Sequence, residues 1–145
     1  MIVVDTTVLV YAVGAHHALR DPCRAVVEAV DAGELTASTT IEVIQEFCHI
    51  RARRRTRADA AALARSYADL FSPLLVVDRD DLTDGLELFD EVDSLGAFDA
   101  VLAATARRRE AGALVSADVA FSTVADLHHL DPASPGFTTA LARLR

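Results

Sequence analysis

The 145-residue sequence contains no lysine and no asparagine, and all 14 of its basic residues are arginine. The absence of lysine excludes the Walker A phosphate loop, which needs a lysine after its glycines. The sequence also lacks a GxSxG motif and any Cys/His/Asn pattern. A nucleophilic hydrolase is therefore disfavoured.

Cysteine and long apolar runs are also scarce. The only two cysteines, Cys23 and Cys48, are separated by 24 residues and form neither a CxxC motif nor a zinc-ligand spacing. We expect both to pack as small apolar groups in a reducing compartment. No apolar run approaches the roughly 18 residues of a membrane span, and the first residues contain no basic signal region. A cytoplasmic protein with no membrane association is expected.

The charge balance is acidic, with 22 Asp and Glu against 14 Arg and a formal net charge of −8. This balance argues against a broad electrostatic surface for nucleic acid. The bases are nevertheless concentrated in residues 51–57 and 107–109. The local sign of the charge therefore matters more than the total.

Short apolar segments alternate with helical patterns along the whole chain. Expected strands cover residues 2–4, 35–38, 74–77, 113–116 and, at the sheet edge, 127–130; expected helices cover about 6–14, 22–33, 41–53, 57–70, 81–91 and 97–109, with a helical turn at 119–124. Such alternation predicts a three-layer α/β/α fold with a central, mainly parallel sheet of four or five strands. We expect one domain over residues 1–145, with a core of about 1–131 and a tail of 132–145.

Four acids, Asp5, Glu46, Asp99 and Asp118, fall where an expected strand ends or on an expected helix. In an open parallel sheet such positions converge on one crevice, where grouped carboxylates bind divalent metal. Taken singly, Asp5 is equally well explained as a helix N-cap and Asp118 as an Asx turn. Taken together, four like charges in one crevice require a cation.

Glu46 and Glu42 compete for one place in this set, because they lie one turn apart on the same expected helix. Glu46 stands at the border of the apolar arc beside Val43 and Ile50, where it would face a cleft. Glu42 completes an expected capping box over residues 39–42. Glu46 is therefore preferred, and the alternative for either residue is a solvated helix face.

Asp99 lies inside the apolar stripe of its expected helix, beside Leu102, Ala103 and Ala106. An unpaired carboxylate in that stripe would be costly to bury, so it either caps the helix or binds a cation. The set contains only hard oxygen ligands and no His or Cys. These ligands favour Mg²⁺, with Mn²⁺ as a substitute, over zinc.

The arginine cluster at the end of the 41–53 helix is a candidate contact for RNA or for a partner protein. Its members are Arg51, Arg53, Arg54, Arg55 and Arg57. The planar guanidinium group suits phosphate binding. The simpler explanation is that cations are favoured at a helix C-terminus by the helix dipole.

Four segments of the chain resemble PIN-domain ribonucleases, and their order and spacing are similar to VapC-type toxins of bacterial toxin–antitoxin modules. They are VVDTTVL at 3–9, VIQEF at 43–47, FDAVLAATA at 98–106 and VSADVAF at 115–121. The resemblance covers positions 1 to about 131. One departure is Ala120, where many relatives have a further acid, which leaves open whether one or two metals bind.

The resemblance implies a Mg²⁺-dependent endoribonuclease in which Asp5, Glu46, Asp99 and Asp118 hold metal and Thr6 or Thr7 assists. It also implies a homodimer and a cognate VapB-like antitoxin that blocks the site. Phosphodiester hydrolysis would then use a metal-bound water as the nucleophile.

Two other functions compete with the nuclease as interpretations of this sequence. A non-catalytic module that binds RNA or a protein is the alternative from another class, although such a module would gain stability by replacing buried carboxylates. A phosphotransferase with an aspartyl-phosphate at Asp5 is disfavoured, because enzymes of that kind use a lysine and a second acid where this chain has Thr7.

Overall fold

The central layer is a sheet of four short parallel strands. In the computed structural model, which describes residues 1–144, the strand order is β2–β1–β3–β4. The strands are β1 (Ile2–Val4), β2 (Ala37–Ser38), β3 (Ala113–Val115) and β4 (His129–Leu130). β1 and β3 are apolar and wholly buried, as expected for central strands covered on both faces.

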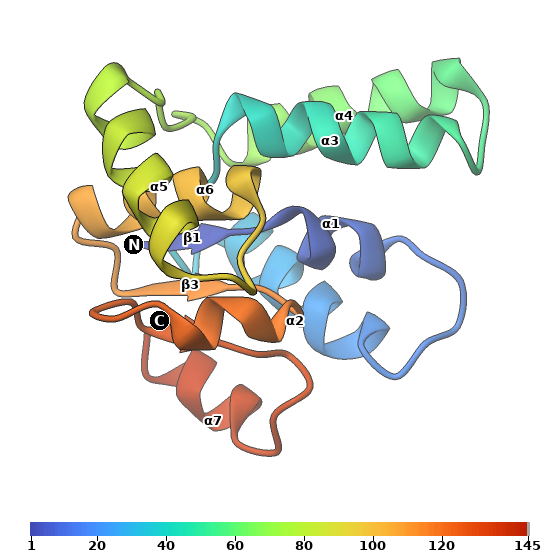
Figure 1. The fold of residues 1–145 in the computed structure, drawn as a ribbon. Helices are drawn as coiled ribbons and strands as arrows, with labels where there is room; N and C mark the ends of the chain where they lie inside the picture. Colours follow the sequence, from blue (N-terminus) through green and yellow to red (C-terminus); the bar gives the residue numbers. More distant parts are fainter. Residues whose placement is uncertain (145) are drawn as a thin grey trace.

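Helices cover the sheet and complete a three-layer α/β/α arrangement (Figure 1). They are α1 (Thr6–Ala12), α2 (Arg20–Asp31), α3 (Ile41–Ala52), α4 (Arg57–Leu70), α5 (Arg79–Glu91), α6 (Ala97–Arg108) and α7 (Phe137–Ala142), with a 3₁₀ helix, η1, at Val119–Thr123. No helix in the described part of the chain is long and apolar enough to cross a membrane. The predicted fold class is confirmed, with four strands.

Two pairs of helices, α3 with α4 and α5 with α6, pack against each other on one side of the sheet. α3 and α4 pack side by side as a helical hairpin, which projects from the sheet on the right of Figure 1. α5 and α6 pack closely against each other, because α5 has Gly85 where it meets Val101. A Cβ built at Gly85 would lie 2.7 Å from the Val101 Cα, so a larger residue would push the two helices apart.

One predicted strand is wrong. Residues 74–77 form no strand, and only Leu75 makes an isolated parallel bridge, to Thr40. β2 is two residues long and offers little edge for pairing. The carbonyl of Val76, the residue after Leu75, accepts a hydrogen bond from the Arg109 side chain at 2.9 Å instead of from a strand. A side-chain contact therefore replaces the expected ladder.

The C-terminal residues and one helix start also differ from the prediction. Residues assigned to a tail form α7, which packs on α2 and places Phe137 and Leu141 in the hydrophobic core. The predicted capping box is wrong, because Thr40 rather than Thr39 is the N-cap of α3. Thr39 donates from its buried hydroxyl to the Val4 carbonyl at 2.6 Å. Glu42 consequently has no capping role.

Candidate active site

Asp5 stands directly after β1 and is the N-cap of α1, with 4 % of its surface exposed. Three donors reach its Oδ2: the hydroxyls of Thr7 and Ser116, each at 2.7 Å, and the Thr7 backbone N–H at 3.2 Å. Within residues 1–144 no donor reaches Oδ1 and no arginine pairs with the carboxylate. One oxygen of a buried carboxylate is thus left to interact with another group.

Parallel pairing of β1 with β3 brings Asp118 to the same end of the sheet as Asp5. Ser116 links them, because its hydroxyl donates to Asp5 and accepts from the Asp118 backbone N–H at 2.9 Å. The Thr7 hydroxyl makes a similar link by accepting from the Ala117 N–H at 2.9 Å. Asp118 itself is the N-cap of η1 and accepts from the Ala120 N–H at 2.8 Å. The turn after β3 is therefore fixed relative to Asp5.

Glu46 reaches this region from α3. Its Oε2 accepts from the hydroxyl of Thr6 at 2.6 Å, which ties α3 to the start of α1. Glu42 lines the same cavity as Glu46, and both are exposed on α3. The negative charge of Glu46 contributes to raising the pKa of Asp99. Glu46 is therefore the one of the two that is electrostatically coupled to the other acids.

Asp99 is half-buried in the first turn of α6. Burial raises the pKa of its carboxyl to about 6, and the charges of Asp5, Asp118 and Glu46 add to this effect, while a hydrogen bond with the Gly96 backbone opposes it. The carboxylate folds back over Gly96: a Cβ built there would lie 2.8 Å from Asp99 Oδ2. The absence of a side chain at position 96 gives the carboxylate its space.

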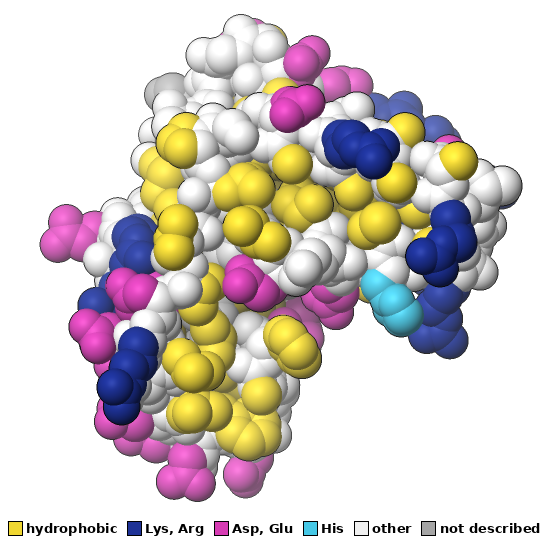
Figure 2. All heavy atoms as spheres, turned by 90° about the horizontal axis from the view of Figure 1, so that it is seen from above, with side chains coloured by type: hydrophobic (Ala, Val, Ile, Leu, Met, Phe, Trp, Pro, Cys, Tyr) yellow, Lys and Arg dark blue, Asp and Glu magenta, His cyan; other side chains and the backbone are white. Residues whose placement is uncertain are grey.

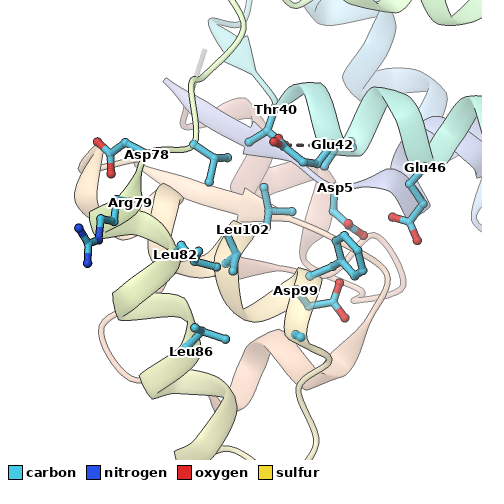
Figure 3. A pocket seen from close by; sticks show the side chains of 15 residues that line it. Asp5, Thr40, Glu42, Glu46, Asp78, Arg79, Leu82, Leu86, Asp99 and Leu102 are labelled. Atoms are coloured by element: carbon cyan, nitrogen blue, oxygen red, sulfur yellow. Dashed lines mark hydrogen bonds between the residues drawn. The ribbon is translucent and has the colours of Figure 1, made fainter.

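A cavity of about 520 Å³ opens beside the acids, between α3, α5 and α6. Figure 3 shows Asp5, Glu46 and Asp99 at one end of this cavity and Leu82 and Leu86 of α5 farther along it. The lining between the two ends is mainly apolar, and Asp78 and Arg79 at the start of α5 lie at the end away from the acids. Figure 2 shows apolar side chains gathered on this face, with acidic side chains among them and arginines at both its left and right edges.

Comparison with known proteins identifies the family. The PIN domain profile matches residues 2–127. This chain belongs to the PIN-domain family. It is 50% identical over 145 residues to Ribonuclease VapC7 of Mycobacterium tuberculosis (strain ATCC 25618 / H37Rv), and the alignment covers 97% of this chain and 98% of that protein. It is therefore a homologue of a VapC ribonuclease, as the sequence motifs predicted.

Two solved structures share the fold. The crystal structure of VapBC2 from Rickettsia felis bound to a promoter DNA fragment has a TM-score of 0.71 at 18% identity, covering 90% of this chain and 98% of the other. The crystal structure of FitAcB from Neisseria gonorrhoeae has a TM-score of 0.70 at 16% identity, covering 91% and 98%. At these identities, the likeness supports the PIN-domain architecture.

The donor set of this PIN domain fits a divalent cation. Its coupled carboxylates offer only oxygen ligands, and within residues 1–144 none of these acids has an arginine partner. Across the same residues, no three His, Cys, Asp or Glu side chains are already arranged as metal ligands. An ion would therefore bind with some side-chain movement, which exposed Glu46 and half-buried Asp99 can make.

The arginines predicted as contacts for RNA or a partner fall into two groups in the structure, one paired within the protein and the others exposed. Arg51 is paired with Asp59 through two hydrogen bonds of 2.6 and 3.2 Å, and it also donates to the Val13 carbonyl. This pairing raises the pKa of Arg51 and lowers the pKa of Asp59. The remaining members of the cluster are exposed, namely Arg53, Arg54, Arg55 and Arg57.

Sequence reasoning missed two residues that shape this PIN-domain site. The sequence assigns no role to Ser116, whereas in the structure its hydroxyl connects Asp5 with the turn after β3. Its position directly after an apolar strand, like that of Asp5, was a usable signal. Gly96 was not singled out, and its effect depends on where the Asp99 carboxylate lies, which spacing alone does not reveal.

Proposed function

We propose that residues 1–145 act as a single-domain toxin that cuts RNA with Mg²⁺ held by Asp5, Glu46, Asp99 and Asp118. The observation that supports this assignment best is that Asp5 is buried, has only hydroxyl and amide donors around it within residues 1–144, and lines a cavity together with Glu46 and Asp99. Membership in the PIN-domain family and the 50% identity to a VapC ribonuclease support the reaction class.

The chain's own residues would orient the reaction. Thr7 and Ser116 fix the Asp5 carboxylate through its Oδ2, and Thr6 holds Glu46 against α1. When bound, Mg²⁺, or Mn²⁺ in its place, would supply a water of lowered pKa and stabilise charge on the phosphate. Asp99, whose pKa is raised to about 6, is already mostly ionised at neutral pH, and a bound cation would favour its charged form further.

A cognate VapB-like antitoxin is the protein partner that the cavity suits best. The two solved structures that share the fold are those of VapBC2 and FitAcB. The cavity combines a mainly apolar lining with an acidic end, which suits an apolar peptide segment that carries an arginine or lysine. We further propose that the protein acts in the cytoplasm as a homodimer.

The exposed arginines at the end of α3 are proposed to bind RNA phosphates. Arg53 follows Glu46 by seven positions, so along the helix axis it lies about 10 Å from Glu46. RNA whose scissile phosphate is at the acids could thus pass over this cluster. Replacing Arg53, Arg54 and Arg55 by glutamine is expected to weaken RNA binding and reduce its dependence on salt concentration.

The deciding experiment is cleavage of mixed cellular RNA by the purified protein, with Mg²⁺ and with EDTA. An Asp99→Asn variant purified identically controls for contaminating nuclease. Cutting that needs metal and disappears in the variant would support the proposal. Folded wild-type protein, free of antitoxin, that cuts no RNA would contradict it and favour a binding module.

A further inference from the structure

Phe98 projects from the chain directly before Asp99. Its side chain is 80% exposed, more than any other large hydrophobic residue exposed within residues 1–144. It lines the same cavity as Asp5, Glu46 and Asp99. Across that part of the chain, its ring also packs against no other aromatic ring. The ring therefore contributes little to the core and is available at the acidic end of the cavity.

The charge of the site explains why an aromatic contact would be useful there. RNA is a polyanion, and the carboxylates of Asp5, Glu46 and Asp99 line the same cavity as Phe98. Apart from the phosphate that contacts metal, RNA near these acids gains affinity best from groups without charge. Stacking on an aromatic ring provides such affinity, because every base has a flat apolar face.

We propose that Phe98 stacks on a nucleobase beside the scissile phosphate and so helps to position the RNA for cleavage. This inference rests on the ribonuclease activity proposed above. Phe98 is a positioning and specificity residue here, and it carries no charge or proton in the reaction. Its neighbour Asp99 would hold the metal under the proposed function, so a base on the ring would lie next to the reacting phosphate.

The test uses short synthetic RNAs that span a cut found in the cellular RNA. Phe98→Ala is expected to raise KM about tenfold with little change in kcat, the size expected for losing one stacked base. Phe98→Trp and Phe98→Tyr should restore KM, while Phe98→Leu, which is apolar but not aromatic, should not. Phe89→Ala is the matched control, because Phe89 is 48% exposed on α5 and does not line the cavity.

Abasic substitutions in the RNA identify the stacked base. Removing that base should raise KM for the wild type, and the same removal should have no further effect in Phe98→Ala. The thermal stability of Phe98→Ala should equal that of the wild type, since the ring is exposed. This control excludes misfolding as the cause of a raised KM.

Three results would overturn the inference. A KM equal to that of the wild type in Phe98→Leu would show that an apolar side chain, without an aromatic ring, is enough to position the RNA. Unchanged cleavage by Phe98→Ala would show that the ring does not position RNA and would point instead to a contact with a protein partner. Cleavage by the wild type would still support the proposed function. If the wild type cuts no RNA, the proposed function fails and the stacking role fails with it. Wild-type activity thus separates the two failures.

Discussion

Asp5 and Asp81 are both buried aspartates beside the start of a helix, yet they differ in whether a cationic side chain neutralises their charge. Asp81 is fully buried at the start of α5, where it pairs with Arg108 at 2.9 Å and Arg109 at 3.0 Å and accepts from the Asp78 N–H. Asp5 is 4% exposed and has no arginine partner within residues 1–144. One charge is neutralised inside the chain, and the other is not.

The difference separates a structural carboxylate from a candidate catalytic one. The Asp81 cluster ties α5 to the end of α6 and thereby holds two walls of the cavity together. The hydroxyls around Asp5 orient its carboxylate without neutralising it. Burial alone would not distinguish the two residues, whereas the nature of their partners does.

The largest expected effect is loss of cleavage in Asp5→Asn. The asparagine oxygen can still accept from Thr7 and Ser116, so the fold should persist, while the charge available to a metal is removed. We expect a 10²- to 10³-fold lower cleavage rate, about the loss caused by removing one strong electrostatic contact from an active site. Stabilisation by Mg²⁺ in thermal unfolding should also weaken. If the variant cuts RNA at the wild-type rate, Asp5 is not a catalytic residue.

Asp81→Asn is the matched substitution in the structural cluster. It exchanges charge-assisted contacts to two arginines for weaker neutral ones, and we expect the free energy of unfolding to fall by about 2–3 kcal/mol. Urea unfolding measures this loss. Cleavage by the folded protein should remain at the wild-type rate. If the stability is unchanged but cleavage is lost, the assignment of roles to the two aspartates is reversed.

The order of elements and the places of the acids could be predicted because they depend on local pattern. β1 and β3 are short apolar runs, and each ends in residues that must turn at the carboxyl edge of a parallel sheet. Asp5 and Asp118 follow from that rule alone. Their metal-binding roles and that of Asp99 stay predictions.

The features that sequence analysis could not supply depend on contacts between distant segments. Residues 74–77 look like a strand, but the contact of Arg109 with Val76 and the shortness of β2 decide otherwise. α7 follows two prolines and looks like a tail, although Phe137 and Leu141 are spaced to share one helix face. The role of Ser116 appears only once β3 lies beside β1.

Gly96→Ala tests whether the Asp99 carboxylate needs its present position. Alanine suits the backbone there, since φ is −68° and ψ is 156°. Its Cβ would lie 2.8 Å from Asp99 Oδ2, so the flexible carboxylate rather than the backbone must move. We expect about a tenfold fall in kcat, similar to the disturbance of a group that orients a metal ligand, with unchanged thermal stability. Full activity in this variant would show that Asp99 tolerates displacement.

The smallest effect concerns the stability of the metal-free protein. Asp99 has no cationic partner among residues 1–144, and its pKa is raised from the ordinary value of 3.8 to about 6. A folded state with the higher pKa binds the proton more tightly, so wild-type stability falls as the pH rises from about 4 to 6 and stays lower above that. Asp99→Asn removes this loss. With EDTA, we expect the variant to equal the wild type near pH 4.

At pH 7.5 the Asp99→Asn variant should be the more stable protein. A shift of about two units corresponds to roughly 3 kcal/mol, and partial exposure of the carboxyl reduces this to about 1–2 kcal/mol. Urea unfolding between pH 4 and 8 gives the difference. A difference that does not grow over this interval would mean that the Asp99 charge is already neutralised without metal, as that of Asp81 is. Added Mg²⁺ should then narrow the difference by stabilising only the wild type, because a ligand stabilises the state that binds it.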